Sequence, residues 1–188
     1  MLIESLTSLN EQIHFLSLLW LFPIIFMFHD FEEILTIERW VTQHGARIQS
    51  SLPPFARKLY QASFQMNTLN FAKDVLAVFI VIVTVTVLAV FYSFYLPFIA
   101  ALHLFFLHVF THVFQSVYFR LYAPGVLTSI VLVLPYSLYT YYRLLTDHIV
   151  GPRDLLWGLI LLLVVLPPAL LLLLQGRKRY VTNTQTKL

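Results

Sequence analysis

An uninterrupted apolar stretch, VLAVFIVIVTVTVLAVFYSFYL at residues 75–96, constrains the fold of this chain more than any other feature. It contains no charged residue, and about 20 apolar residues cross a bilayer as a helix. Lipid offers no hydrogen-bond partners, so such a segment must satisfy its backbone internally and becomes helical. The composition agrees, because 59% of the 188 residues are hydrophobic and 11% are charged, whereas soluble domains carry about 25% charged residues.

Four further apolar segments have comparable length. The sequence therefore predicts an all-α fold, a polytopic transmembrane helix bundle of about five spans, in one domain over residues 1–176. Residues 177–188 form a basic tail that we expect to be disordered. Pro97 separates the second span from the third, and the predicted spans are Ile13–Glu32, Val75–Leu96, Phe98–Phe119, Val126–Leu145 and Leu155–Gln175.

The basic residues predict the orientation of the chain. Five spans place the termini on opposite sides, and a cytoplasmic C-terminus puts ten Lys and Arg inside and only Arg143 and Arg153 outside. This distribution follows the positive-inside rule, so we expect an integral protein of the cell (plasma) membrane with its N-terminus outside. The basic residues flank apolar segments and form no patch interleaved with aromatics, which argues against nucleic acid as a partner.

The segment HDFEE, residues 29–33, follows directly on the first apolar run. On a helix His29, Glu32 and Glu33 share one face. The run before His29 is short, so a full span draws His29 to the edge of the hydrocarbon, where ionisable groups face the bundle interior and have partners. The alternative is a helix that continues into the cytoplasm with solvated carboxylates.

The third predicted span carries histidines that could meet this segment. His108 and His112 are four residues apart, and Gln115 lies about one turn further on the same face. Helical rise places His112, Gln115 and His29 in one layer on the cytoplasmic side, while His108 lies near the bilayer centre and fits this layer less well. We therefore expect His29, Glu33, His112 and His108 to be metal ligands.

Other polar residues fall at the same level. Asn70 and Asp74 share a face at the start of the second span, and Arg120 follows the third. Together with Gln115 they are the predicted substrate-binding residues, at the depth of a lipid headgroup. For Arg120 the alternative is a positive-inside anchor.

Two stretches resemble a known family. HDFEE and the downstream HVFTHVFQSVYFRLYAPG are similar to the HXXEE-domain family, small polytopic membrane proteins named for their motif. His29, Glu32 and Glu33 match that motif directly. The resemblance implies a membrane-embedded domain and suggests a metal-dependent enzyme.

Imidazole and carboxylate together suit a divalent metal, Zn²⁺ or non-haem iron. A catalytic zinc needs about three protein ligands and one open position. His29, His112 and one of Glu32 or Glu33 supply these, and the other carboxylate is the predicted general base, which makes both glutamates candidate catalytic residues. The small number of histidines favours a hydrolase over a di-iron oxidase. The absence of cysteine excludes thiolate ligands and cysteine nucleophiles.

The leading hypothesis is thus a membrane metalloenzyme whose partners are membrane lipids and a lipid or other hydrophobic substrate at the cytoplasmic leaflet. A proton or metal-ion transporter could use the same His and Glu side chains as a relay. A non-catalytic membrane adaptor could use them to hold helices together. Polar residues become sparse beyond His108, which counts modestly against transport.

Overall fold

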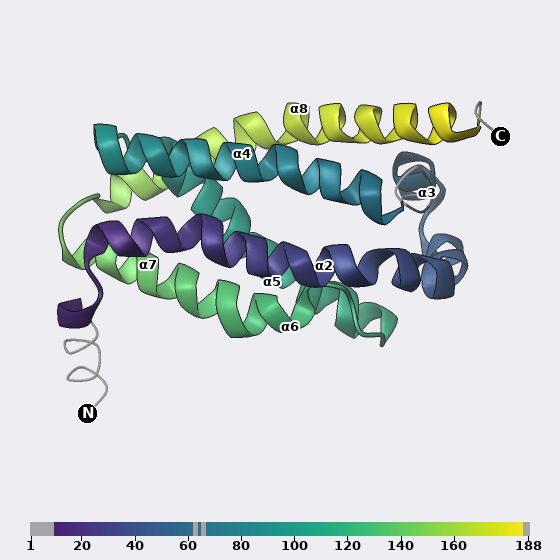
Figure 1. Cartoon of the computed structure of the whole chain (residues 1–188), viewed down its shortest axis with the longest axis horizontal. Coiled ribbons are helices and arrows are strands. Elements are labelled where there is room, and N and C mark those ends of the chain that lie inside the picture. The colour runs from purple at the N-terminus through teal and green to yellow at the C-terminus, as the bar shows by residue number, and fades with distance from the viewer. Residues whose placement is uncertain (1–9, 62–63, 65–66, 186–188) are drawn as a thin grey trace.

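The part of the chain that the structure describes is built of helices and contains no strand. In this computed structural model that part comprises residues 10–61, 64 and 67–185. The long helices run along one axis, with α2 (purple, Phe15–Ser51) lying between α4 (teal, Thr68–Tyr92) and α7 (green, Leu134–Thr146) (Figure 1). The predicted all-α class is confirmed.

The other elements complete the bundle. α5 (Leu96–Phe119) packs against α8 (Pro152–Gln185), and the short α3 (Pro54–Tyr60) precedes α4. Between α5 and α7 lie α6 (Val126–Thr128) and a π-helical turn, η2 (Ser129–Val133). Pro135, just after this turn, lacks the amide that an α-helix would donate to the carbonyl four residues earlier, so the wider turn lies where regular pairing fails.

Among the residues that the structure describes, four helices are long and apolar enough to cross a membrane, namely Phe15–Ser51, Thr68–Tyr92, Leu96–Phe119 and Pro152–Arg177. This makes the chain an integral membrane protein. The predicted fourth span, Val126–Leu145, corresponds to three consecutive helical pieces, namely α6, the π-helical turn η2 and α7. The number of spans and the orientation of the termini stay predictions.

Several helix boundaries differ from the predicted ones. α2 continues to Ser51 instead of ending near Glu32, and no proline lies between Glu32 and Pro53 to interrupt it. α4 ends at Tyr92, where Ser93 adopts a left-handed conformation with φ 53°. Pro97 belongs to the first turn of α5, a position that tolerates its missing N–H. α8 extends to Gln185 and thus through most of the expected tail, and the division into domain and tail stays a prediction.

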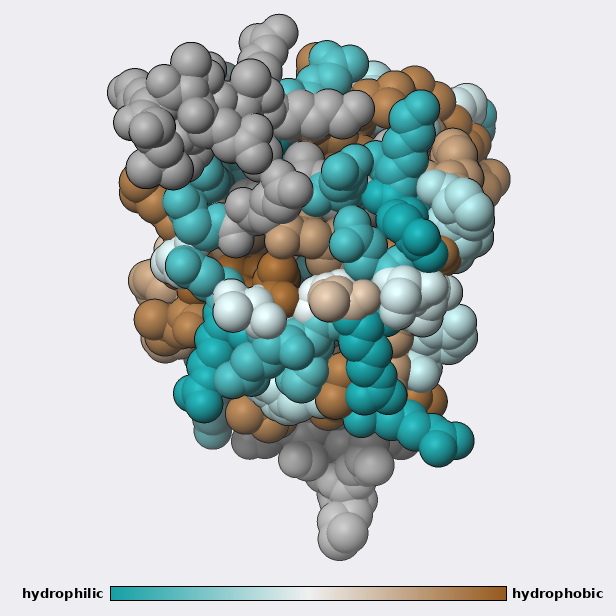
Figure 2. Space-filling view, turned by 90° about the vertical axis from the view of Figure 1, so that its right-hand side faces the viewer, coloured by the Kyte–Doolittle hydropathy of each residue, from teal (hydrophilic) through white to brown (hydrophobic). Residues whose placement is uncertain are grey.

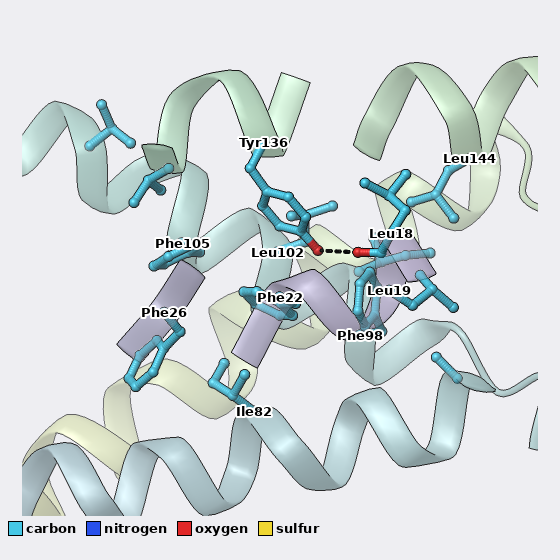
Figure 3. Close-up of a cluster of buried hydrophobic side chains, with 14 of the residues drawn as sticks. Leu18, Leu19, Phe22, Phe26, Ile82, Phe98, Leu102, Phe105, Tyr136 and Leu144 are labelled. Atoms are coloured by element: carbon cyan, nitrogen blue, oxygen red, sulfur yellow. Dashed lines mark hydrogen bonds between the residues drawn. The ribbon is translucent and has the colours of Figure 1, made fainter. Parts of the chain in front are cut away.

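Phe22 lies at the centre of the core and joins α2 to α5 and α7 (Figure 3). Its ring centroid is 5.2 Å from that of Phe98, 5.3 Å from Phe105 and 5.9 Å from Tyr136. The Tyr136 hydroxyl donates to the carbonyl of Leu18 at 3.3 Å, which satisfies its buried polar end. These contacts join α2 to α5 about two turns before His29 and, at Phe105, about one turn before His108.

Polar residues gather at the end of the molecule where α2 and α8 have their carboxyl ends (Figure 2). Apolar surface is visible in a recess between them. Charged side chains at a helix end and apolar ones along its length suit a protein that meets water at this end and lipid along its sides.

Candidate metal centre

Four side chains from the middle parts of two helices meet: His29 and Glu33 of α2, and His108 and His112 of α5. One potential ligand atom from each lies within 4.8 Å of all the others. Glu33 Oε1 is 3.0 Å from His112 Nε2, 3.7 Å from His108 Nε2 and 3.9 Å from His29 Nε2. We call these four residues the His/Glu cluster.

Helical spacing brings each pair onto one face. His29 and Glu33 are four residues apart on α2, and so are His108 and His112 on α5. The ring of His29 lies edge-on to Phe105, 5.9 Å between centroids, and 5.0 Å from the ring of His112. The structure thus brings these side chains of α2 and α5 together, as the sequence predicted, although they lie in the middle of α2 and not at its end. His108 joins the cluster despite its expected depth.

The cluster contains nitrogen atoms that protein groups leave unpaired. Within the part of the chain that the structure describes, His29 Nε2 and His112 Nδ1 are buried without a hydrogen-bond partner, a costly arrangement for a polar atom. His108 Nε2 and His112 Nε2 lie only 2.7 Å apart, so a proton or a cation must lie between two lone pairs that would otherwise repel. A divalent ion would satisfy His29 Nε2, His108 Nε2 and His112 Nε2 together.

The spacing of the four atoms fits a small metal ion. Zinc binds histidine nitrogen at about 2.0–2.1 Å, which places tetrahedral ligands about 3.3 Å from one another. The measured separations of 2.7, 3.0, 3.7 and 3.9 Å fall on both sides of this value. Three imidazoles and a carboxylate are also the ligand types of zinc and non-haem iron sites.

Gly125 lies against the cluster from the loop before α6. Its φ of +82° is one that glycine adopts readily. A Cβ atom here would lie 2.8 Å from Glu33 Oε1 and 2.9 Å from Cε1 of both His29 and His112. The missing side chain thus leaves space beside the potential ligand atoms.

Glu32 points away from the cluster and binds the segment that contains Gly125. One carboxylate oxygen accepts from the Tyr122 hydroxyl and, at 3.1 Å, from the Gly125 amide. The other accepts from the Thr128 amide at 2.8 Å and from the Thr128 hydroxyl at 2.5 Å. Burial, together with the bond to Glu32, raises the pKa of Tyr122 to about 12.

A family comparison bears on these residues. The family model described as "Protein of unknown function with HXXEE motif" matches residues 20–140, more than half of the chain. The chain belongs to this HXXEE family. No curated protein and no solved structure matches it. The HXXEE residues are His29, Glu32 and Glu33, and the structure assigns the outer two to the cluster and the middle one to the loop.

A cavity of about 870 Å³ opens beside the HXXEE residues. Glu33, His108 and His112 line one side of it, and apolar side chains of four helices line most of the rest, among them Phe71, Phe114, Tyr118, Leu166 and Leu170. Its size lies at the upper end of the range for small-molecule sites, and a mostly apolar wall with a few convergent polar groups is typical of them. Arg177 and Gln115 also reach it.

The predicted substrate-binding residues lie in different places. Gln115 lines the cavity. Asp74 is buried and accepts from Arg177 Nε at 2.8 Å. The amide of Asn70 donates to the Asn67 side chain that caps α4, and Arg120 ends α5 in a left-handed conformation with an exposed side chain. Only Gln115 is brought next to the His/Glu cluster, and the substrate roles stay predictions.

Sequence reasoning did not single out three residues at this site: Tyr122, Gly125 and Arg177. Tyr122 and Gly125 belong to the YAPG turn, whose Pro-Gly pair signals a tight loop but not what the loop covers. Arg177 was counted only as a basic residue of the tail. The contacts of Tyr122 and Gly125 with Glu32 span about 90 positions along the chain, beyond the reach of local pattern.

Proposed function

We propose that this HXXEE-family protein is a membrane-embedded metal-dependent enzyme, a hydrolase, that acts on a lipid or other hydrophobic substrate at the cytoplasmic leaflet of the plasma membrane. The observation that carries the proposal is the convergence of three imidazoles and one carboxylate with ligand atoms within 4.8 Å. Two buried ring nitrogens in that group have no hydrogen-bond partner among the described residues.

The buried members of the cluster are the proposed ligands. His29 and His112 are 1% and 5% exposed, and Glu33 lies between them. Bound Zn²⁺ or Fe²⁺ would supply a Lewis acid and a water molecule of lowered pKa. Three protein ligands leave a position open for such chemistry, whereas four would make a closed, structural site.

His108 is the proposed proton-handling residue. Its side chain is 41% exposed and lines the cavity, while its Nε2 remains 2.7 Å from His112 Nε2. An imidazole can take a proton from water and deliver it to a leaving group. Its exposure places it where a substrate would arrive.

The cavity supports a lipid-like substrate. Its walls are mainly Phe, Tyr, Leu and Pro side chains, which favour an alkyl chain. Its polar side chains include Glu33, His108 and His112 of the cluster together with Arg177 and Gln115, and they suit the polar part of an amphipathic molecule. The cytoplasmic leaflet is proposed because ten of the twelve basic residues belong to segments that the positive-inside rule places inside.

Metal content tests this proposal first. Protein purified in detergent and analysed by elemental mass spectrometry should contain about one Zn or Fe per chain. His29→Ala, Glu33→Ala and His112→Ala should each remove it, while His103→Ala, on the same helix as His112 but outside the cluster, should retain it. Wild-type protein without stoichiometric metal after reconstitution with Zn²⁺ or Fe²⁺ would refute the metalloenzyme.

Activity is the second test. Protein in vesicles of mixed phospholipid should release lipid products that mass spectrometry detects, and His108→Ala should abolish release while keeping the metal. Ion flux without product formation would instead identify a transporter. If the cluster variants only lower the stability of the protein, and do so whether or not metal is present, the protein is an adaptor.

A further inference from the structure

The two adjacent acids of the motif have different tasks. Glu33 lies among the three cluster histidines. Glu32 receives four donors from residues 122–128, among them the Thr128 hydroxyl at 2.5 Å. Such a short O–H···O distance is typical of a hydroxyl that donates to an ionised carboxylate.

Thr128 connects Glu32 to His29. Its Oγ1 lies 2.9 Å from His29 Nδ1 as well as 2.5 Å from Glu32 Oε2. A hydroxyl has one proton and two lone pairs, while a carboxylate only accepts. The Thr128 proton therefore points to Glu32, and the Thr128 oxygen accepts from His29, so the ring proton of neutral His29 lies on Nδ1.

This assignment decides what His29 offers to the cluster. With its proton on Nδ1, Nε2 bears a lone pair, and Nε2 is the nitrogen that is buried, without a partner and 3.9 Å from Glu33 Oε1. The opposite tautomer would place an N–H there, which cannot ligate a metal. Histidine ligands are commonly fixed in this way by a partner on their other nitrogen.

We infer that Glu32 and Thr128 are positioning residues. Glu32 accepts the proton of the Thr128 hydroxyl, and the Thr128 oxygen accepts the proton of His29 Nδ1. These two bonds hold His29 in the tautomer that directs a lone pair into the cluster. This inference rests on the proposed metal site for its purpose but not for its geometry. It also separates the two motif glutamates, with Glu33 as ligand and Glu32 as the residue that orients a ligand.

The tautomer can be measured in metal-free protein. In chelator-treated protein labelled with ¹⁵N-histidine, NMR distinguishes protonated from bare ring nitrogens, and His29→Asn assigns the signal by its loss. We expect the His29 proton on Nδ1 in wild type and in Thr128→Ser, which keeps the hydroxyl. In Thr128→Val, which is nearly isosteric, both tautomers should be populated. Wild-type His29 with its proton on Nε2 would overturn the inference.

Zn²⁺ affinity gives the second readout. Thr128→Val should weaken binding by about 10–100-fold, the usual effect of losing a partner of a ligating histidine. Thr128→Ser should restore affinity to within a few-fold of wild type, and Thr84→Val, whose hydroxyl bonds only the Ile80 carbonyl of its own helix, should leave it unchanged. Equal affinity for Thr128→Val and wild type would also overturn the inference.

These outcomes are distinct from failure of the metal site. If wild-type protein binds no metal but has His29 protonated on Nδ1, the proposed function is refuted, while the inferred positioning of His29 by Thr128 and Glu32 stands. Should Thr128→Val fail to fold, Glu32→Gln takes its place: the loss of an acceptor-only partner should mix the His29 tautomers, and an unmixed Nδ1–H form in that variant counts against the inference.

Discussion

α5 carries histidines in two environments that differ sharply. His103 lies toward the start of the helix, where its Nδ1 is 2.6 Å from the Tyr141 hydroxyl and its Nε2 is 2.9 Å from the Leu155 carbonyl. A carbonyl only accepts, so Nε2 carries the proton and Nδ1 accepts from Tyr141. Both ring nitrogens are satisfied, and the ring stacks on Tyr141.

The His/Glu cluster, two turns further along, has the opposite character. His29 Nε2 and His112 Nδ1 have no partner, and two Nε2 atoms face each other at 2.7 Å. On α5, His103 thus binds α7 and α8 through both ring nitrogens, whereas His108 and His112 have lone pairs available. The difference teaches that the partners of an imidazole, more than its depth in the membrane, distinguish a structural histidine from a potential ligand.

Loss of the shared carboxylate should have the largest effect on this contrast. Glu33→Gln keeps the size of the side chain but removes the charge that lies within 3.0–3.9 Å of three imidazoles. Zn²⁺ affinity should fall by more than the roughly 100-fold that loss of an outer partner can cause. Isothermal titration with Zn²⁺ measures this. Unchanged affinity would mean that the cluster is as structural as the His103 site.

Gly125→Ala should have the next largest effect. The added Cβ would meet Glu33, His112 and His29 at 2.8–2.9 Å, on a backbone with positive φ. We expect loss of metal binding and a decrease of about 1–3 kcal/mol in the free energy of unfolding. Denaturation followed by circular dichroism, together with metal content, checks both.

Gly176→Ala is the matched control for this change, since a Cβ at Gly176 meets nothing within 4 Å. It should bind metal as wild type does. Gly125→Ala protein with wild-type metal content would contradict the close approach of this loop to the cluster.

The sequence allowed the helical class and the pairing of the two motifs to be predicted, for physical reasons. Four-residue spacing fixes which side chains share a helix face, so His29 with Glu33 and His108 with His112 follow from the sequence alone. Apolar length predicts that the helices lie in a membrane. Together these were sufficient to place the candidate ligands near one another.

The finer division of roles was not predictable in this way. Glu32 and Glu33 are neighbours in sequence, and nothing local shows that one faces three imidazoles while the other binds the Thr128 hydroxyl and amide. The estimate of depth from helical rise likewise placed His108 too far from the other ligands, because a side chain reaches beyond the level of its own Cα. Such contacts depend on how a distant loop folds back, which the spacing of residues does not encode.

His103 provides the converse test, with a smaller effect. His103→Leu leaves the Tyr141 hydroxyl and the Leu155 carbonyl without their partner. The free energy of unfolding should fall by about 1–3 kcal/mol, the usual effect of unpaired polar groups in a protein interior, while Zn²⁺ affinity stays at the wild-type value. Thermal denaturation and zinc titration of the same sample separate the two. Loss of metal from this variant would erase the distinction between the two environments.

The smallest effect is expected at Tyr122, which is linked to His29 through Glu32 and Thr128. Tyr122→Phe removes one of four donors to that carboxylate, so Zn²⁺ affinity should change by less than the ~10-fold expected of a direct partner of a ligand.

Its clearest signature is in alkaline solution. The Tyr122 pKa is raised from 10.0 to about 12 by burial and by Glu32, so the folded state retains this proton where the unfolded state loses it. The contribution of Tyr122 to stability is therefore complete below pH 10 and is lost as the pH rises toward 12. The tyrosinate absorbance of wild type minus that of Tyr122→Phe should titrate with a midpoint near pH 12. A midpoint near 10 would show that the loop does not rest on Glu32.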